Sequence, residues 1–365
     1  MKIALVVHDF DPRFGQGRYT VELARRLALA HDVHVYANRF NAPLEPNVTF
    51  QRVPACRSSA LGTVLTFVCA AERLLAARAY DIIHAQGLSC WRADVITAHI
   101  CNAARFAHAP PSNWKGHLFP LVVEPLERDF YQHPRARHLI GVSQKVAGEI
   151  AAEYDWQRPV SVIYHGTDTD TFKPPSETDR QHARDFFRLP RKAWAWLFVG
   201  EAAKGVAPAI EQLVNFPEAI LLVVSRSAPH AYEALAEARG VRQRLRWVGP
   251  VENTAVAYQA ADVFLYPSDY DAFGMVVAEA MAAGLPVIVG RATGAAEWIA
   301  HGRNGFLCDP RHAASLEQPL AALRNHTSLA AETGRAARAT VLEHTWDRCA
   351  RETLRVYEQV LHARP

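Results

Sequence analysis

The sequence predicts an α/β protein made of two domains, each a doubly wound parallel sheet. The chain has 365 residues, which is longer than a single hydrophobic core usually supports. Hydrophobic residues make up 50% of it and charged residues 21%, as in ordinary globular proteins. Short apolar runs alternate with helical stretches in both halves of the chain, and this alternation is typical of parallel sheets covered by helices.

The first half starts with an apolar run at residues 2–7, which is too short for the core of a signal peptide and predicts a buried strand. Helices are then expected at 18–30 and 62–79, and strands at 33–37, 82–84, 138–142 and 160–164. Residues 102–134 interrupt this rhythm with a mixed aromatic and basic insertion. The longest weakly polar stretch, 61–71, falls well short of the roughly 20 residues that a membrane span requires. We therefore expect no segment to cross a membrane.

A polar segment with several prolines, residues 168–191, is the best candidate for a linker between the halves. After it, strands are expected at 194–200, 219–225, 245–248, 262–266, 286–289 and 305–308. We place the domains at 1–172 and 173–345, and expect the last helix, 346–362, to pack on either half. Ligands of such sheets bind outside the carboxyl ends of the strands, so the loops after the strands are where chemistry is expected.

Charge and cysteine content exclude several classes of protein. Lys and Arg number 40 against 37 Asp and Glu, a formal net charge of +3, so no nucleic-acid partner is expected. The six cysteines contain no CxxC pair, which fits neither a zinc site nor a dense disulfide framework. Reduced thiols and a cytoplasmic location are therefore expected.

The most informative local pattern runs from Tyr266 to Gly284, a loop that joins an apolar strand to a helix starting near Gly274. Asp271 would lie in the loop and Glu279 more than one turn inside the helix, so the two carboxylates would address different parts of one elongated ligand. Gly274 and the amides after it lie where a helix N-terminus binds an anion. On spacing alone an alternative stays open, in which Asp271 caps the helix and Glu279 pairs with a basic residue.

This block resembles the Glu-x7-Glu donor-binding motif of the retaining glycosyltransferases of family 4. Further similar segments lie in register or in the expected order: 163–174, 267–268, 273–274, 279–280, 283–284, 294–297 and 304–306. The resemblance covers nearly the whole chain. It implies the GT-B architecture, in which two Rossmann-like domains face each other across a cleft. It also makes the N-terminal domain the acceptor-binding one and the C-terminal domain the one that binds the nucleotide-sugar donor.

The resemblance also implies roles for single residues. Asp271, which replaces the usual Glu, would contact hydroxyls of the donor sugar, and Glu279 would hold the donor ribose. Lys204 would neutralise charge on the leaving diphosphate. Many relatives carry an arginine where this chain has Glu201. Arg226 is a candidate to replace that missing arginine. Other donor-binding residues are expected at Val251, Ser268, Phe273, Gly274, Met275 and Val276.

Two segments of the N-terminal half complete the expected site. Gly15, Gln16 and Gly17, in the loop after the first strand, resemble the glycine-containing loop that approaches the donor phosphate. A nicotinamide dinucleotide site is disfavoured, because no acidic residue follows about 20 positions later. His99 matches a Thr-x-His segment that many relatives place near the reaction centre, where it would bind the sugar or the acceptor; a purely structural histidine is the alternative.

No metal and no other cofactor is expected. Three Asp-x-Asp triplets begin at Asp9, Asp168 and Asp269, but other segments of the family pattern account for them, and the sequence has no cluster with metal-ligand spacing. The insertion carries the following aromatic and basic residues, which predict peripheral contact with an anionic membrane: Arg105, His108, Trp114, Lys115, His117, Phe119 and Tyr131. The competing interpretation is a solvated acceptor loop.

Taken together, the residues and the resemblance predict a retaining hexosyltransferase. The donor would be a nucleotide diphosphate sugar, UDP-glucose first, and the acceptor a hydroxyl of a cell-envelope glycan or glycolipid such as lipopolysaccharide core. The pair Glu127-Arg128 resembles a helical pair in the branch of the family that adds glucose to the heptose of that core. Two alternatives remain open: an isomerase similar to the hydrolysing UDP-N-acetylglucosamine 2-epimerases, and a non-catalytic partner subunit that binds sugar nucleotides.

Overall fold

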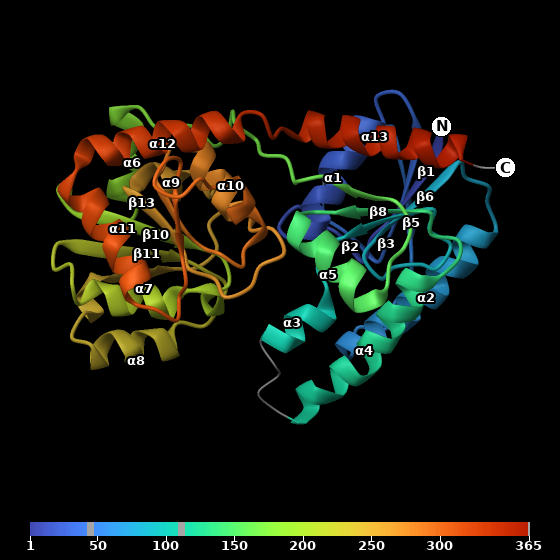
Figure 1. Ribbon diagram of the computed structural model, residues 1–365, viewed down its shortest axis with the longest axis horizontal. Coiled ribbons are helices and arrows are strands. Elements are labelled where there is room, and N and C mark those ends of the chain that lie inside the picture. The colour runs from blue at the N-terminus through green and yellow to red at the C-terminus, as the bar shows by residue number, and fades with distance from the viewer. Residues whose placement is uncertain (42–46, 109–113, 364–365) are drawn as a thin grey trace. The chain divides into compact units, whose positions relative to one another are not determined.

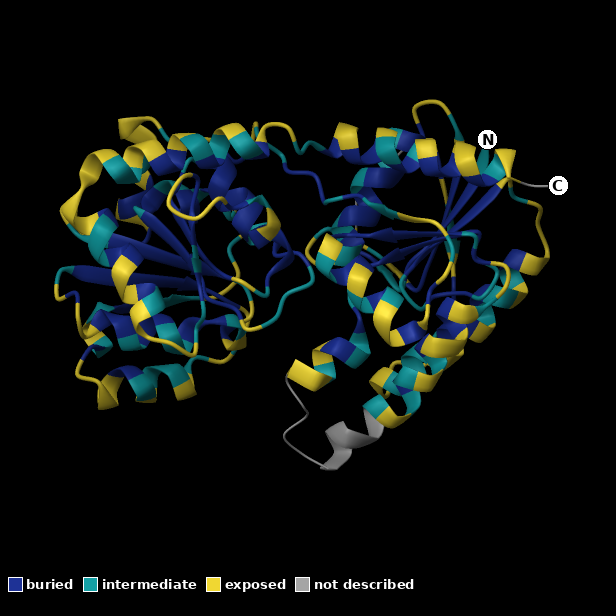
Figure 2. Cartoon of the chain, in the orientation of Figure 1, coloured by how far each residue is buried: buried dark blue, intermediate teal, exposed yellow. Residues whose placement is uncertain are grey.

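The computed structural model describes residues 1–41, 47–108 and 114–363, with the side chains of 114–119 left aside (Figure 1). The chain forms two compact units: unit 1 comprises Met1–Gly166 and Trp346–Pro365, and unit 2 comprises Thr167–Thr345. The chain therefore changes unit between Gly166 and Thr167, whereas the sequence-based boundary follows Phe172. In each unit a buried parallel sheet lies between helices that expose one face (Figure 2), so each unit has the α/β architecture that the sequence predicts.

Unit 1 contains a seven-stranded parallel sheet in the order β5-β3-β1-β6-β7-β8-β9. Its strands are β1 (Lys2–Val6), β3 (Asp32–Ala37), β5 (Val48–Arg52), β6 (Ile82–Gln86), β7 (Val95–Ala98), β8 (His138–Gly141) and β9 (Val160–Val162). Two short strands, β2 (Asp9–Phe10) and β4 (Arg39–Phe40), pair beside it. The central strands read as continuous apolar runs because both faces of a parallel sheet are covered.

The helices of unit 1 are α1 (Gly15–Leu27), α2 (Ala60–Ala76), α3 (Asn102–His108), α4 (Trp114–Gln132), α5 (Gln144–Tyr154) and α13 (Trp346–His362). Serine side chains cap two of them: Ser59 accepts from the Gly62 amide at the start of α2, and Ser143 from the Val146 amide at the start of α5. The last helix, α13, lies against α1 in Figure 1. The buried hydroxyl of Tyr357 in α13 lies 2.7 Å from Nδ1 of His84 in β6, so the C-terminal helix is part of unit 1.

Unit 2 contains a six-stranded parallel sheet in the order β12-β11-β10-β13-β14-β15. Its strands are β10 (Trp194–Val199), β11 (Ala219–Val224), β12 (Leu245–Val248), β13 (Val263–Tyr266), β14 (Val287–Gly290) and β15 (Phe306–Cys308). Its helices are α6 (Glu177–Phe186), α7 (Val206–Leu213), α8 (His230–Ala238), α9 (Ala255–Ala260), α10 (Met275–Ala282), α11 (Ala314–Asn325) and α12 (Thr327–Val341), with 3-10 turns η1 (Ala202–Lys204), η2 (Arg242–Arg244) and η3 (Gly294–Trp298).

The segment that the sequence suggests as a linker, 168–191, is instead folded into unit 2 and contains α6. Ser176 and Asp179 form a capping box at the start of this helix. Arg184 donates to Asp262 Oδ2 at 2.7 Å and to the Arg191 carbonyl at 2.7 Å. The linker prediction is wrong. A polar composition flanked by prolines is typical of linkers, but surface helices that are held by a few buried arginine contacts have the same composition.

Both sheets change direction once, and this positions the loops that matter for function. In unit 2 the chain runs outward from β10 to β12 and then returns to place β13 on the other side of β10. In unit 1 the same change occurs between β1 and β6. Loops that leave the carboxyl ends of such adjacent strands diverge, and ligands of doubly wound sheets bind at this switch point.

Candidate active site

The switch point of unit 2 brings Lys204 and Asp271 together. Lys204 ends the 3-10 turn that follows β10, and Asp271 lies in the loop that follows β13. The two loops touch: Gly205 has φ +132°, and a Cβ there would lie 2.8 Å from the Pro267 ring, so only glycine fits. As a result Lys204 Nζ lies 2.8 Å from Asp271 Oδ2. The sequence predicted both residues, and the structure places them in one ion pair.

The Asp271 carboxylate is held from two further sides. The Tyr266 hydroxyl donates to Oδ2 at 2.6 Å, and the Phe273 amide donates to Oδ1 at 3.2 Å. Burial and the neighbouring charge of Asp271 raise the pKa of Tyr266 well above its usual value, so this hydroxyl remains a donor. The Asp271 side chain is 12% exposed and that of Lys204 is 34% exposed. A cation and a carboxylate are thus oriented at the edge of the sheet, within reach of solvent.

Helix α10 begins directly after this loop, with Gly274 as its N-cap in the left-handed conformation at φ +86°. A Cβ at Gly274 would lie 2.7 Å from Thr293 Cγ2, so the helix start packs closely on the loop after β14. Met275 and Val276 begin the helix and are only partly buried. Because Gly274 occupies the N-cap position, Asp271 does not cap the helix, and the first amides of α10 are oriented as in helix N-termini that bind anions.

The second carboxylate, Glu279, lies inside α10 and is 6% exposed. The Tyr258 hydroxyl, from α9, lies 2.7 Å from Glu279 Oε2 and 3.3 Å from the Val276 carbonyl oxygen. Burial of a carboxylate is costly unless donors compensate it, and the tyrosine hydroxyl is one such donor. The two carboxylates of the motif therefore hold different positions, one in the loop and one along the helix.

The other residues expected near the donor take different places. Ser268 is 1% exposed, and its hydroxyl donates within the loop to the Tyr270 carbonyl at 3.0 Å. Phe273 is buried with its ring edge on Trp298, so both residues shape the loop from inside. Val251 follows β12 and is partly buried, while Glu201 and Arg226 are exposed.

In unit 1 the predicted glycine loop is the first turn of a helix. Helix α1 begins at Gly15, three residues earlier than the sequence suggests, after a turn at residues 12–14 that follows β2. Gly17 permits this, since a Cβ there would lie 2.3 Å from the Asp11 carbonyl oxygen. Gln16 Nε2 donates to the carbonyl oxygen of Gln86, the last residue of β6, at 2.5 Å. The start of α1 is thereby fixed at the switch point of unit 1.

His99 lies in the loop after β7, near the same switch point. Its Nε2 lies 2.9 Å from Gln86 Oε1, and its ring meets Tyr19 edge-on with centroids 5.0 Å apart. Burial, aided by the neighbouring His165, lowers the pKa of His99 well below its usual value, so the ring is neutral. Gln86 links Gln16 and His99, yet no sequence pattern singled it out.

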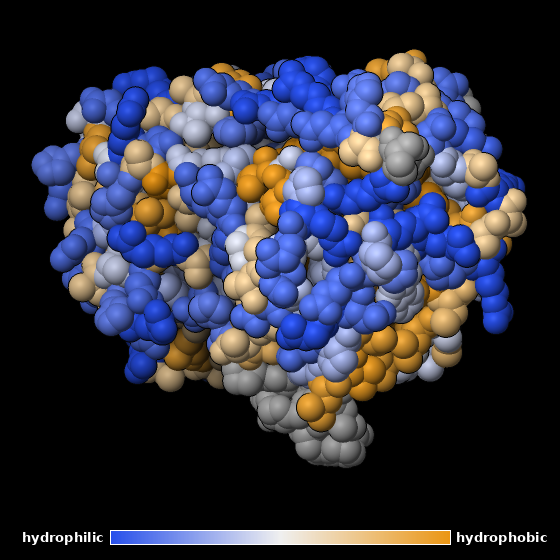
Figure 3. All heavy atoms as spheres, turned by 45° about the vertical axis from the view of Figure 1, so that its right-hand side comes forward, coloured by the Kyte–Doolittle hydropathy of each residue, from blue (hydrophilic) through white to orange (hydrophobic). Residues whose placement is uncertain are grey.

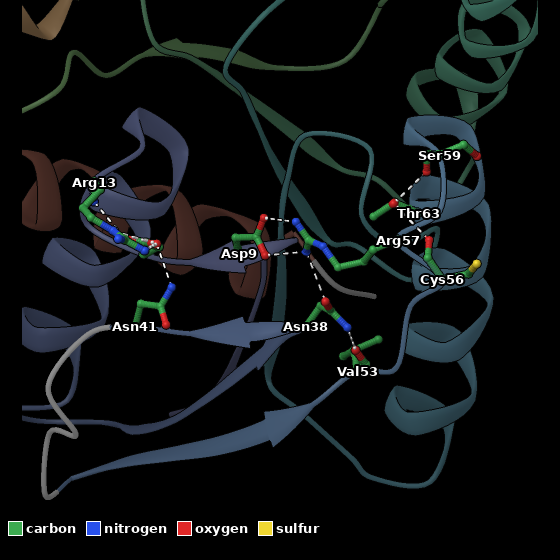
Figure 4. A network of polar contacts seen from close by, with 10 residues as sticks. Asp9, Arg13, Asn38, Asn41, Val53, Cys56, Arg57, Ser59 and Thr63 are labelled. Atoms are coloured by element: carbon green, nitrogen blue, oxygen red, sulfur yellow. Dashed lines mark hydrogen bonds and ion pairs between the residues drawn. The ribbon is translucent and has the colours of Figure 1, made fainter. Parts of the chain in front are cut away.

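The first Asp-x-Asp triplet forms ion pairs with arginine (Figure 4). Asp9 accepts from Arg57 at 2.8 Å, and Asp11 accepts from Arg13 at 2.6 Å and from Asn41 at 2.9 Å. In the third triplet, Asp271 pairs with Lys204 as described above. Within the described ranges, no group of three or more His, Cys, Asp or Glu residues is arranged to hold a metal ion.

Family models match both halves of the chain. Residues 179–340 match the model for glycosyl transferases group 1, and residues 15–171 match the model for glycosyltransferase family 4. Each half of the chain thus matches a glycosyltransferase family model over most of its length. The second match begins at the start of α1, and the first includes Lys204, Asp271 and Glu279, so the family models cover the residues described above.

Two relatives of this glycosyltransferase carry the same name, and a third is uncharacterised. The D-inositol 3-phosphate glycosyltransferase of Xylanimonas cellulosilytica is 28% identical over 96% of this chain and 93% of its own length. That of Catenulispora acidiphila is 31% identical, over 61% of this chain and 56% of its own. An uncharacterised glycosyltransferase of Methanocaldococcus jannaschii is 26% identical over 98% of both chains.

Solved structures share the GT-B fold. WaaG, a glycosyltransferase involved in lipopolysaccharide biosynthesis, superposes with a TM-score of 0.83 at 22% identity, over 97% of this chain and 99% of its own. Sucrose-phosphate synthase of Thermosynechococcus elongatus has a TM-score of 0.83 at 23% identity over the full length of both. Anabaena HepE, solved with UDP-glucose, has a TM-score of 0.77 at 18% identity, over 98% and 100%.

The insertion of this glycosyltransferase is only partly the surface that the sequence suggested. Arg105 and His108 are exposed, but Tyr131 is buried and its ring stacks on Tyr154 with centroids 5.2 Å apart. The expectation that Tyr131 lies on a membrane-facing surface is wrong, because its ring fills the space between α4 and α5. The remaining predicted side chains lie outside those described: Trp114, Lys115, His117 and Phe119. Glu127 is also buried and accepts from Tyr154 at 2.6 Å, which is a structural use of this residue.

Proposed function

We propose that this glycosyltransferase moves a hexose from UDP-glucose to a hydroxyl of a cell-envelope glycan or glycolipid, with retention at the anomeric carbon. The observation that carries the proposal is the arrangement at the switch point of unit 2. There Lys204 pairs with Asp271, a helix N-terminus follows, and Glu279 lies further along the same helix. A cation, the amides of a helix N-terminus and two separate carboxylates suit a ligand with a diphosphate between two polyhydroxylated groups.

Each of these groups has a part in donor binding. Glu279 accepts the two hydroxyl protons of the ribose, and Asp271 accepts from hydroxyls of the sugar, since an ionised carboxylate offers about four lone-pair sites. The first amides of α10 bind phosphate oxygens. In unit 1, the helix N-terminus at Gly15–Gly17 is a separate candidate for binding an anion. The complex of HepE with UDP-glucose and the similarity of its fold support this choice of donor.

The reaction follows from where negative charge develops. As the glycosidic bond to the diphosphate breaks, charge grows on its oxygens, and Lys204 with the helix amides stabilises it. One of those oxygens takes the proton of the acceptor hydroxyl, which attacks on the face that the diphosphate leaves, so the configuration is retained. Asp271 is not a nucleophile in this scheme, because its carboxylate is engaged by Lys204 and Tyr266. No metal ion and no other cofactor is required.

The acceptor has two candidates. The fold of WaaG, which is involved in lipopolysaccharide biosynthesis, favours a glycolipid of the envelope. The full-length similarity to a D-inositol 3-phosphate glycosyltransferase favours a small inositol phosphate instead. Both offer a ring hydroxyl beside anionic groups.

The first test is a thermal-shift panel with UDP, GDP, ADP, CMP and NAD, with EDTA and then with added metal. Ligand at 100 times its dissociation constant adds about 2.7 kcal/mol, or several degrees for a protein of this size. We expect a shift with UDP that EDTA does not abolish. A shift with NAD alone would refute the transferase proposal.

Turnover assays then separate the alternatives. UDP-glucose is offered with deacylated lipopolysaccharide core or with D-inositol 3-phosphate, and the product is analysed by NMR for its anomeric configuration. We expect UDP release that depends on one of the two acceptors. Conversion of UDP-N-acetylglucosamine without an acceptor would instead support the epimerase, and binding without any turnover would support a non-catalytic partner.

We also propose that unit 1 contacts the cytoplasmic face of an anionic membrane. None of the helices in the described segments is long and apolar enough to cross a bilayer. Leu65 of α2 and Leu121 of α4 are 38% and 71% exposed, and Figure 3 shows a band of hydrophobic surface on the side of unit 1 where these helices lie. We expect the protein to float with vesicles containing phosphatidylglycerol, and Leu121→Glu to float less. Equal flotation of both would refute this surface.

A further inference from the structure

Each carboxylate of the donor-binding motif is paired with its own buried tyrosine. The Tyr266 hydroxyl donates to Asp271 Oδ2 at 2.6 Å, and the Tyr258 hydroxyl lies 2.7 Å from Glu279 Oε2. The two tyrosines are 2% and 0% exposed, respectively. A hydrogen bond from a buried hydroxyl to a carboxylate is short and strong. A buried tyrosine ring also cannot rotate away from its partner without disrupting the packing of the core.

The same ring holds both tyrosines in place. Phe264, at the centre of β13, lies 6.1 Å from the Tyr266 ring and 5.7 Å from the Tyr258 ring, measured between centroids. Tyr266 is also stacked on Phe198 of β10 at 5.6 Å, and Phe172 meets Tyr258 edge-on at 5.5 Å. The core of unit 2 therefore determines where each hydroxyl points.

We propose that Tyr266 and Tyr258 are positioning residues with separate tasks: Tyr266 sets Asp271 for the transferred sugar, and Tyr258 sets Glu279 for the nucleoside. The proposal rests on the function proposed above. It extends that function by assigning sugar recognition and nucleoside recognition to two different tyrosine–carboxylate pairs within one domain.

The contacts of Asp271 show why Tyr266 becomes important when the donor binds. Oδ2 accepts from both Tyr266 and Lys204, and Oδ1 accepts from the Phe273 amide. When Lys204 turns to the diphosphate, one lone-pair site on Oδ2 becomes available to a sugar hydroxyl. The Tyr266 hydroxyl then remains as the side-chain donor that keeps this oxygen in place.

The two pairs are separated by measuring UDP and UDP-glucose binding calorimetrically for Tyr266→Phe and Tyr258→Phe, which keep the ring and remove only the hydroxyl. For Tyr266→Phe we expect UDP-glucose to bind about tenfold more weakly while the Kd for UDP stays within about twofold. For Tyr258→Phe we expect both ligands to bind about tenfold more weakly. The matched control is Tyr36→Phe in unit 1, which removes a partly buried contact of 2.7 Å with the Tyr80 hydroxyl and should alter neither Kd.

A double-mutant cycle covers the case in which a phenylalanine variant is unstable. In an Asp271→Ala background, Tyr266→Phe should cause no further loss of UDP-glucose affinity, because no side-chain acceptor is left for Tyr266 to position. An unchanged ratio of the two Kd values in both tyrosine variants, or additive losses in the cycle, would overturn the proposal while leaving the donor assignment intact. Absence of binding of either ligand to the unmodified protein would overturn the proposed function itself.

Discussion

Replacing Lys204 by methionine removes the cation at the switch point and keeps most of the side-chain volume. The attraction between Lys204 Nζ and Asp271 Oδ2 at 2.8 Å is about 6 kcal/mol at an effective dielectric constant of about 20. The lysine side chain is 34% exposed, so desolvation and side-chain entropy offset most of this, and the net effect on stability is at most about 1 kcal/mol. The effect on catalysis is larger, because loss of one preorganised charge at a leaving group costs about 100-fold in turnover.

Initial rates of UDP release and thermal unfolding of Lys204→Met test these two magnitudes together. We expect kcat to fall about 100-fold, while Tm changes by no more than about 4 °C. Lys192→Met, a substitution at an exposed lysine before β10, is the matched control and should change neither. If kcat stays within a few-fold of the unmodified protein, or if Tm falls in step with kcat, Lys204 supports the loop and not the leaving group.

Four further substitutions test other parts of the structure. Glu279→Ala should weaken UDP binding by calorimetry about tenfold or more, and binding that survives intact would remove Glu279 from the site. Gly274→Ala should lower stability by about 1–2 kcal/mol in thermal unfolding, because φ is +86° and a Cβ would lie 2.7 Å from Thr293; Gly148→Ala, with open space around its Cβ in α5, should instead raise stability by about 0.5–1 kcal/mol. Burial lowers the pKa of His84 to about 3. Between about pH 6.5 and 3 the unfolded chain therefore binds more protons than the folded chain. As the pH is lowered through this range, the free energy of unfolding decreases by up to about 1.4 kcal/mol per pH unit. The urea midpoint of His84→Gln should fall less steeply over this range, and parallel slopes would contradict the assignment.

Much of the fold could be predicted from local sequence. The apolar runs of β1, β10 and β11 are continuous because both faces of a parallel sheet are buried, and this pattern is readable without any tertiary contact. Helix α6 was missed because its sequence is polar and flanked by prolines, while its stability depends on the contact between Arg184 and Asp262. The early start of α1 was missed for a similar reason, since the close approach of Gly17 to Asp11 is a tertiary feature.

For the site, the sequence determined which loops carry charge: Lys204 after β10, and Asp271 and Glu279 around the start of α10. Strand and helix periodicity is local, so it places these residues at the carboxyl edge of a sheet. Only the tertiary structure decided their partners. Glu279 is held by Tyr258, 21 residues away, and His84 by Tyr357, 273 residues away. Buried hydroxyls and amides look like ordinary core residues in a sequence, and a parallel sheet places strands side by side that are distant along the chain. The charged groups of this glycosyltransferase are thus specified by local sequence, and their orientation by the packing of its core.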